Sequence, residues 1–199
     1  MMLTLGLTGS LASGKSTTAA LFAEAGVAVF SADAAVHDLY RGRAAPMIEA
    51  AFPGTVSAGA VDRARLADAV LDDPAALARL EAIVHPLVRD EEARFLAEAA
   101  AAGHRIALCD IPLLFETGAE ERYDALVVVT APPEICRARA LARPGMTAAR
   151  YETLMNRQLP DADKRRRAHF VVDTGGGLAA TRRAVDGIVR ALAPVAALR

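Results

Sequence analysis

The stretch Gly9-Ser10-Leu11-Ala12-Ser13-Gly14-Lys15-Ser16 has the pattern G-x-x-x-x-G-K-S, which is typical of a phosphate-binding loop (P-loop). The apolar run Leu3–Leu7 before it predicts a strand, and Thr17–Glu24 after it predicts a helix. In such a turn the backbone N–H groups face phosphate oxygens, Lys15 reaches the β- and γ-phosphates, and the Ser16 hydroxyl can ligate Mg²⁺. A chance glycine-rich turn is the alternative, but the flanking strand and helix disfavour it. We therefore expect ATP-type nucleotide binding, carried by Leu11, Ala12, Ser13, Gly14, Lys15, Ser16 and Thr17.

The composition excludes several classes of protein. The chain has 199 residues, 53% of them hydrophobic, and a net charge of −1, so nothing in its charge favours nucleic acid or an anionic membrane. Cys109 and Cys136 are far apart and lack metal-type spacing, as expected for reduced thiols. The N-terminus has no basic segment or cleavage site, and no apolar stretch is long enough to span a membrane. We expect a cytoplasmic protein, a monomer or weak homo-oligomer, with small molecules as partners.

Strands and helices alternate along the chain. The later strand-like runs are continuously apolar, which is typical of a parallel sheet that is covered on both faces. The sequence therefore predicts an α/β fold with a core of five parallel strands flanked by helices. Besides the first strand, the expected strands are Gly26–Ser31, Arg105–Asp110, Ala125–Thr130 and Phe170–Asp173.

Residues 34–103 are too long for one crossover and have mostly helical patterns, so they predict a helical insertion into a core formed by 1–33 and 104–199. Asp73-Pro74 predicts a capped helix start, His85-Pro86 a bend or restart, and Gly103 a helix end. In a kinase such an insertion is where the acceptor substrate binds.

A second helical excursion, Pro133–Arg167, is interrupted at Pro144-Gly145 and at Pro160 and is rich in arginine. A solvated basic face is the ordinary explanation of such a run. Its position after the fourth strand also suits a closing lid, at about residues 137–167. Arg139 and Arg143 share one helix face at i, i+4 spacing and could both reach phosphates. After the last strand, Leu178–Leu192 predicts an amphipathic helix.

The pattern of carboxylates favours a kinase over a GTPase or a motor ATPase. The chain lacks N-K-x-D, and Asp110-Ile111-Pro112 lacks the adjacent glutamate that would activate water. Asp33 follows the second strand, whose C-terminal end we expect next to the P-loop, so it can accept the proton of an attacking hydroxyl. The alternative is that Asp33 caps a helix that begins near Ala34. Asp110, at the end of the third strand, is a candidate for metal binding or for a turn.

Several motifs together resemble one family. They are Leu7–Thr17, Ser31-Ala32-Asp33, His85-Pro86-Leu87-Val88, Ile111-Pro112-Leu113-Leu114-Phe115-Glu116 and Phe170–Gly175. The chain resembles the dephospho-CoA kinase family over nearly its full length.

The resemblance implies ATP-dependent phosphorylation of the ribose 3′-hydroxyl of dephospho-CoA, with Mg²⁺, a helical CoA-binding insertion and a helical lid. It implies Asp33 as general base, Lys15, Arg139 and Arg143 as catalytic, and Ser16 and Asp110 at the metal. His85, which by residue chemistry alone is more often structural, becomes a substrate contact by resemblance. The remaining implied sites are Asp33, Leu113 and Glu116 for the substrate, Thr174 and Gly175 for the nucleotide, and a basic pair, Lys164-Arg165, before the last strand.

The chain also departs from the family's usual pattern. Ser10 and Ala12 replace two loop glycines, and Ala12 therefore needs a backbone conformation that an L-residue can adopt. Ser31 replaces a first aspartate, and Thr174 stands where asparagine is frequent, which puts purine selectivity in question. The competing hypotheses are another small-molecule kinase, for a nucleoside monophosphate, shikimate or gluconate, and a non-catalytic nucleotide-binding module.

Overall fold

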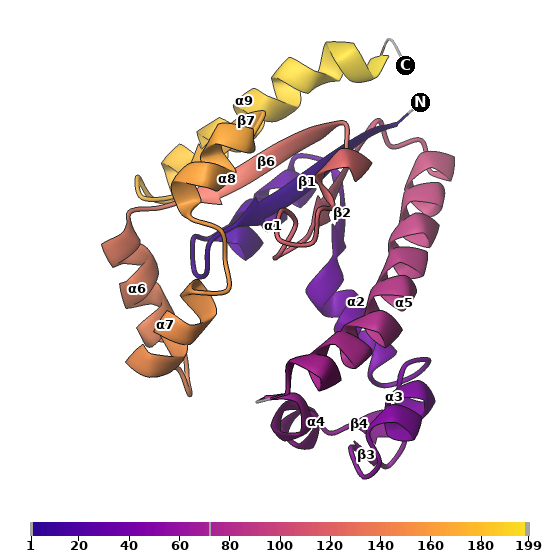
Figure 1. The fold of residues 1–199 in the computed structure, drawn as a ribbon. Coiled ribbons are helices and arrows are strands. Elements are labelled where there is room, and N and C mark those ends of the chain that lie inside the picture. Colours follow the sequence, from indigo (N-terminus) through magenta and orange to yellow (C-terminus); the bar gives the residue numbers. More distant parts are fainter. Residues whose placement is uncertain (1, 72, 198–199) are drawn as a thin grey trace. The chain divides into compact units, whose positions relative to one another are not determined.

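The structure is a computed structural model that describes residues 2–71 and 73–197 (Figure 1). The chain forms two compact units. One contains Met1–Phe30 and Glu98–Arg199, and the other contains Ser31–Ala97. We describe each unit by itself.

The first unit is built on a five-stranded parallel sheet with the strand order β2-β5-β1-β6-β7. β1 is central, and its Leu7 is in register with Asp110 of β5 and Val127 of β6. β5 therefore lies between β1 and β2, so the end of the second strand is one strand removed from β1. The strands are β1 (Leu3–Gly9), β2 (Ala28–Ser31), β5 (Ile106–Asp110), β6 (Ala125–Thr130) and β7 (Phe170–Asp173).

Helices pack against this sheet. α1 and α9 contact one another, and α9 also contacts β7, while α8 contacts β6 (Figure 1). The core between α1, α9 and the strands includes fully buried Leu5, Phe22, Val127 and Val185, whose removal from water is the main source of stability here. The helices are α1 (Lys15–Glu24), the 3₁₀ turn η1 (Glu120–Arg122), α6 (Pro133–Leu141), α7 (Ala148–Met155), α8 (Asp161–Arg167) and α9 (Leu178–Ala197).

The second unit is mostly helical and has its own core, which includes Leu39, Ile48, Leu66 and Leu80. It contains a two-stranded antiparallel hairpin that we did not predict, because each strand has only two residues. The elements are α2 (Ala32–Leu39), α3 (Ala45–Ala51), β3 (Val56–Ser57), β4 (Ala60–Val61), α4 (Arg63–Val70) and α5 (Pro74–Ala101), the last of which continues into the first unit.

Two helices continue where the sequence suggested an interruption or an end. α5 is one helix of 28 residues that includes Pro86, so the expected restart at His85-Pro86 is absent and the alternative of a bend stays a prediction. Buried Val84 and Leu87 on either side of Pro86 hold both turns in one core, which compensates for the hydrogen bond that proline cannot make. For the same reason α9 continues through Pro194, with Leu192 and Ala196 buried.

The helix N-caps show whether Asp33 caps a helix. Asp73 accepts hydrogen bonds from the N–H groups of Ala75 (2.9 Å) and Ala76 (3.0 Å), as predicted. The cap of α2 is Ser31, whose hydroxyl accepts from the Ala34 N–H (3.3 Å). The suggestion that Asp33 caps this helix is therefore wrong. Asp33 lies exposed in the first turn, where a carboxylate is favourable to the helix dipole.

Within the described residues, no helix combines the length and the apolar character that crossing a membrane requires.

Candidate active site

The P-loop joins the end of β1 to the start of α1. Gly14 is the N-cap of α1 and has a φ of +94°, a conformation that only glycine adopts without strain. A Cβ on Gly14 would also come within 3.0 Å of the Thr174 side chain. Ala12 has a φ of +61°, so this residue adopts the left-handed conformation in spite of its side chain. The loop has the strand, turn and helix N-terminus that phosphate binding requires.

Lys15 and Asp110 form an ion pair. Lys15 begins α1, and Asp110 ends β5 in the strand next to β1. The Asp110 side chain is 9% exposed and that of Lys15 is 15% exposed, so the pair is largely shielded from water, and its Coulomb attraction is stronger than at the surface. The sheet thus brings together two residues that were predicted separately, as a phosphate contact and a metal contact.

Ser16 and Thr17 lie exposed in the first turn of α1. Among the described residues no group of three or more histidine, cysteine, aspartate or glutamate side chains could hold a metal. Mg²⁺ commonly uses one or two protein oxygens, with phosphates and water completing its octahedron. The Ser16 hydroxyl and the Asp110 carboxylate supply such a donor set, so the residues present fit a phosphate-bound Mg²⁺.

Arg139 and Thr174 hold the P-loop from the side of α6 and β7. The Arg139 guanidinium donates to the Thr174 hydroxyl (2.8 Å) and to its carbonyl (3.2 Å). The same hydroxyl donates to the Ser13 carbonyl (2.7 Å). Thr174 is buried, whereas Arg143, one turn beyond Arg139, is exposed to solvent. Gly175 follows and donates its N–H to the Asp173 carboxylate (2.7 Å).

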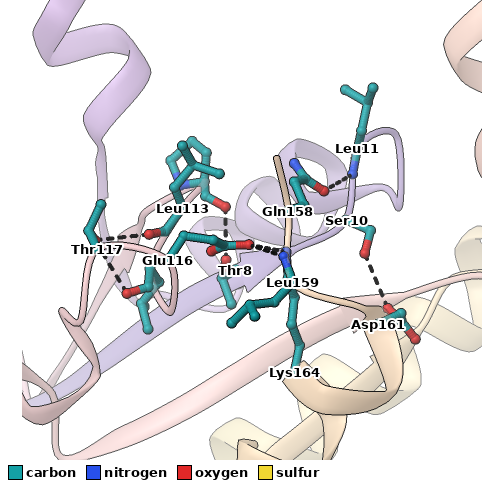
Figure 2. A network of polar contacts seen from close by, with 12 residues as sticks. Thr8, Ser10, Leu11, Leu113, Glu116, Thr117, Gln158, Leu159, Asp161 and Lys164 are labelled. Atoms are coloured by element: carbon teal, nitrogen blue, oxygen red, sulfur yellow. Dashed lines mark hydrogen bonds and ion pairs between the residues drawn. The ribbon is translucent and has the colours of Figure 1, made fainter. Parts of the chain in front are cut away.

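Glu116 contacts the connection between α7 and α8. Its Oε1 accepts from the Leu159 N–H (2.8 Å) and lies 2.9 Å from the Lys164 ammonium (Figure 2). The Lys164 side chain is completely buried, so the predicted basic pair is split: Lys164 is internal, and Arg165 is exposed. Leu113, in the loop after β5, is 39% exposed and accessible to a ligand.

Two expected substrate residues belong to the second unit. Asp33 is exposed in α2, and His85 is half-buried in the middle of α5. Their roles stay predictions.

Sequence reasoning missed two residues that contact the P-loop, Gln158 in the α7–α8 connection and Asp161 at the start of α8 (Figure 2). No local pattern marks them, since Gln158 and its partner Leu11 are 147 positions apart.

The cysteines take no part in this site. Both are buried, and desolvation raises the pKa of the Cys136 thiol, against the opposing charge of Arg139. Cys136 therefore remains a neutral thiol near pH 7 and is a poor nucleophile.

The comparison with known families decides the assignment. The family model for dephospho-CoA kinase matches residues 3–180. The chain belongs to the dephospho-CoA kinase family. A dephospho-CoA kinase of Brucella melitensis is 57% identical over 200 residues, covering the whole of both chains. One of Mesorhizobium japonicum is 60% identical over 188 residues, covering 94% of this chain and 95% of the relative.

Solved structures share the fold of this chain. A crystal structure from Thermus thermophilus is 35% identical, with a TM-score of 0.82, and the match covers 96% of this chain and 98% of that one. A dephospho-CoA kinase from Campylobacter jejuni, at 23% identity and a TM-score of 0.73, matches 98% of each chain and shows a shared fold. Shikimate kinase from Bacteroides thetaiotaomicron is more distant, with a TM-score of 0.56 at 13% identity over 96% of this chain and 99% of that one, and shares the general fold.

Proposed function

We propose that this protein transfers the γ-phosphoryl group of ATP to the ribose 3′-hydroxyl of dephospho-CoA, giving coenzyme A and ADP, the last step of CoA synthesis. The observation that carries the proposal is the family match over residues 3–180, on a chain whose P-loop sequence is complete. A P-loop alone would fit many kinases, whereas relatives at 57% and 60% identity bear this one name.

In the proposed reaction the 3′-oxygen of the ribose forms a bond to the γ-phosphorus, and the bond from that phosphorus to the β–γ bridging oxygen breaks. ADP leaves with the bridging oxygen and its electron pair. Asp33 takes the proton of the attacking hydroxyl. This role is supported by the position of Asp33 on the family's motif and by its freedom from the cap of α2, which Ser31 provides.

The P-loop would hold the ATP phosphates through its N–H groups, and Lys15 would move from Asp110 to the β- and γ-phosphates. Ser16 and Asp110 would then hold Mg²⁺, which neutralises phosphate charge when bound. Arg139 and Arg143 would stabilise the charge that develops on the transferred group, as cationic lid residues do in phosphoryl transfer.

The insertion, residues 34–103, would bind dephospho-CoA with His85, and Leu113 would contribute from the loop after β5. Glu116 would act on the substrate mainly through the α7–α8 connection, because Leu159 and Lys164 already occupy one of its oxygens. Residues 137–167 would form the lid. We place this reaction in the cytoplasm, where ATP is made available to biosynthetic enzymes, with the protein as a monomer or weak homo-oligomer.

A panel of acceptors tests the proposal. ADP release is measured with ATP and Mg²⁺ in the presence of dephospho-CoA, AMP, shikimate or gluconate. Release that depends on dephospho-CoA, and exceeds that of the other acceptors by at least about 10²-fold, is expected, since a site that hydrogen-bonds its substrate discriminates strongly. Faster release with another acceptor would overturn the assignment, and no acceptor-dependent release at all would point to a non-catalytic module.

A further inference from the structure

The connection between α7 and α8, residues 156–160, contacts the first half of the P-loop. The Leu11 N–H donates to Gln158 Oε1 (3.1 Å), and the Ser10 hydroxyl donates to Asp161 Oδ1 (3.4 Å) (Figure 2). Ser10 and Leu11 are the two residues before Ala12, so these contacts hold the part of the P-loop that leads directly into Ala12.

Ala12 needs such support. Its φ of +61° is uncommon for a residue with a side chain, and conformations of this kind persist only where the surroundings impose them. The Ala12 side chain packs with Ala140 of α6 and Tyr151 of α7 in a small buried cluster. Apolar packing thus holds Ala12 itself, while Gln158 holds the peptide just before it.

The residues that follow Gln158 in the chain are held by hydrogen bonds to other parts of the fold. The next residue, Leu159, is tied through its N–H to Glu116 (2.8 Å), and Asp161 also accepts a hydrogen bond from the Thr130 hydroxyl (2.8 Å). The connection is therefore anchored to the loop after β5 and to the end of β6. A side chain presented from such an anchored segment loses little entropy when it binds the loop.

We infer that Gln158 is a positioning residue for ATP, which holds the Leu11–Ala12 turn in the phosphate-binding conformation. The inference rests on the proposed function only in taking ATP as the nucleotide. Loss of the Gln158 contact frees the turn to relax away from the left-handed conformation, and ATP binding must then restore it. The free energy of that step is lost from ATP affinity, not from the chemical step or from acceptor affinity.

The test replaces the amide by an apolar side chain of similar size, Gln158→Met, which removes the acceptor and leaves the charge unchanged. The matched control is Asn156→Leu, at an exposed position in the same segment. The dissociation constants of ATP and of dephospho-CoA are measured by calorimetry, whose stoichiometry corrects for any unfolded fraction. The steady-state kcat and KM values follow.

For Gln158→Met, ATP binding about three- to tenfold weaker is expected, which is the range for one neutral hydrogen bond. The dephospho-CoA dissociation constant and kcat at saturating ATP should stay within about threefold of wild type, and Asn156→Leu should keep its ATP affinity within about twofold. ATP affinity within twofold of wild type in Gln158→Met, or an equal loss in Asn156→Leu, would overturn the inference. Both outcomes can be read from ATP binding alone, so they remain distinct from failure to phosphorylate dephospho-CoA.

Discussion

The ammonium group of Lys15 is paired with the carboxylate of Asp110, which ends β5 beside β1, the strand that leads into the P-loop. A carboxylate in this position holds the lysine at the loop before any phosphate is bound. If Lys15 binds the ATP phosphates as we propose, nucleotide binding exchanges one charge partner of this lysine for another.

Lys15→Met should lower turnover by about 10²–10⁴-fold, because it removes a positive charge that acts on the transferring phosphoryl group. Methionine replaces the unbranched part of the side chain and removes only the terminal ammonium group, so the packing around α1 should survive. Steady-state kinetics gives the loss, and circular dichroism with thermal unfolding checks the fold. Turnover near that of wild type in the folded variant would remove the loop lysine from the mechanism.

Arg139→Ala and Arg143→Ala should each lower kcat more than they weaken ATP binding, because lid charges matter most once charge spreads in the transition state. We expect a loss of kcat of about 10²-fold for Arg139→Ala. Arg139 is linked to the P-loop through Thr174, whose hydroxyl accepts from Arg139 and donates to the Ser13 carbonyl. Arg137→Ala, which removes an exposed arginine from the same helix, is the control. Variants that raise only the KM for ATP would identify these arginines as ground-state binders.

Asp33 and Ser31 offer a matched pair of substitutions. Asp33→Asn should lower kcat by about 10²–10⁴-fold, the usual effect of losing a general base, with dephospho-CoA affinity changed much less. Ser31→Ala should instead remove the cap of α2 and lower the free energy of unfolding by about 1 kcal/mol. Kinetics, calorimetry and denaturant unfolding on both variants separate the two roles. If Asp33→Asn keeps turnover within about threefold of wild type, the acceptor hydroxyl is activated elsewhere.

Lys164→Met should destabilise the protein by about 3–5 kcal/mol, because Glu116 loses its charged partner inside the fold. The double variant Glu116→Gln with Lys164→Met should be less destabilised than the single one, since it leaves no carboxylate without a cation. Chemical denaturation of the wild type, of the two single variants Lys164→Met and Glu116→Gln, and of the double variant measures the coupling. Equal stability of Lys164→Met and the wild type would show that this buried pair contributes nothing to folding.

The sequence predicted the strands well, because a continuous apolar run between turns has few other interpretations. The bounds expected for β6 and β7 are those observed, and β5 differs by one residue. The ends of helices were harder to predict where a proline lies inside the helix. Pro86 and Pro194 are local signals for a break, but burial of the flanking turns outweighed them, and no local pattern reports that burial.

For the site, sequence motifs identified the groups but not their partners. Lys15 and Asp110 were each singled out, whereas their pairing follows from β5 being placed beside β1. The contacts of Gln158 with Leu11 and of Lys164 with Glu116 join segments far apart in the chain, and only the folded structure shows them. From the motif we expected only that Ala12 adopts a conformation open to an L-residue. Its left-handed φ of +61° and the residues that pack around it are seen only in the structure.

The central claim is tested most directly by the identity of the product. Wild-type protein is incubated with ATP, Mg²⁺ and dephospho-CoA, and the product is examined by mass spectrometry and phosphorus NMR, with Lys15→Met as the inactive control. The account predicts that dephospho-CoA gains one phosphoryl group, on the ribose 3′-oxygen, with one ADP formed for each molecule of product. Unchanged dephospho-CoA, or a phosphoryl group on any other atom, would contradict it.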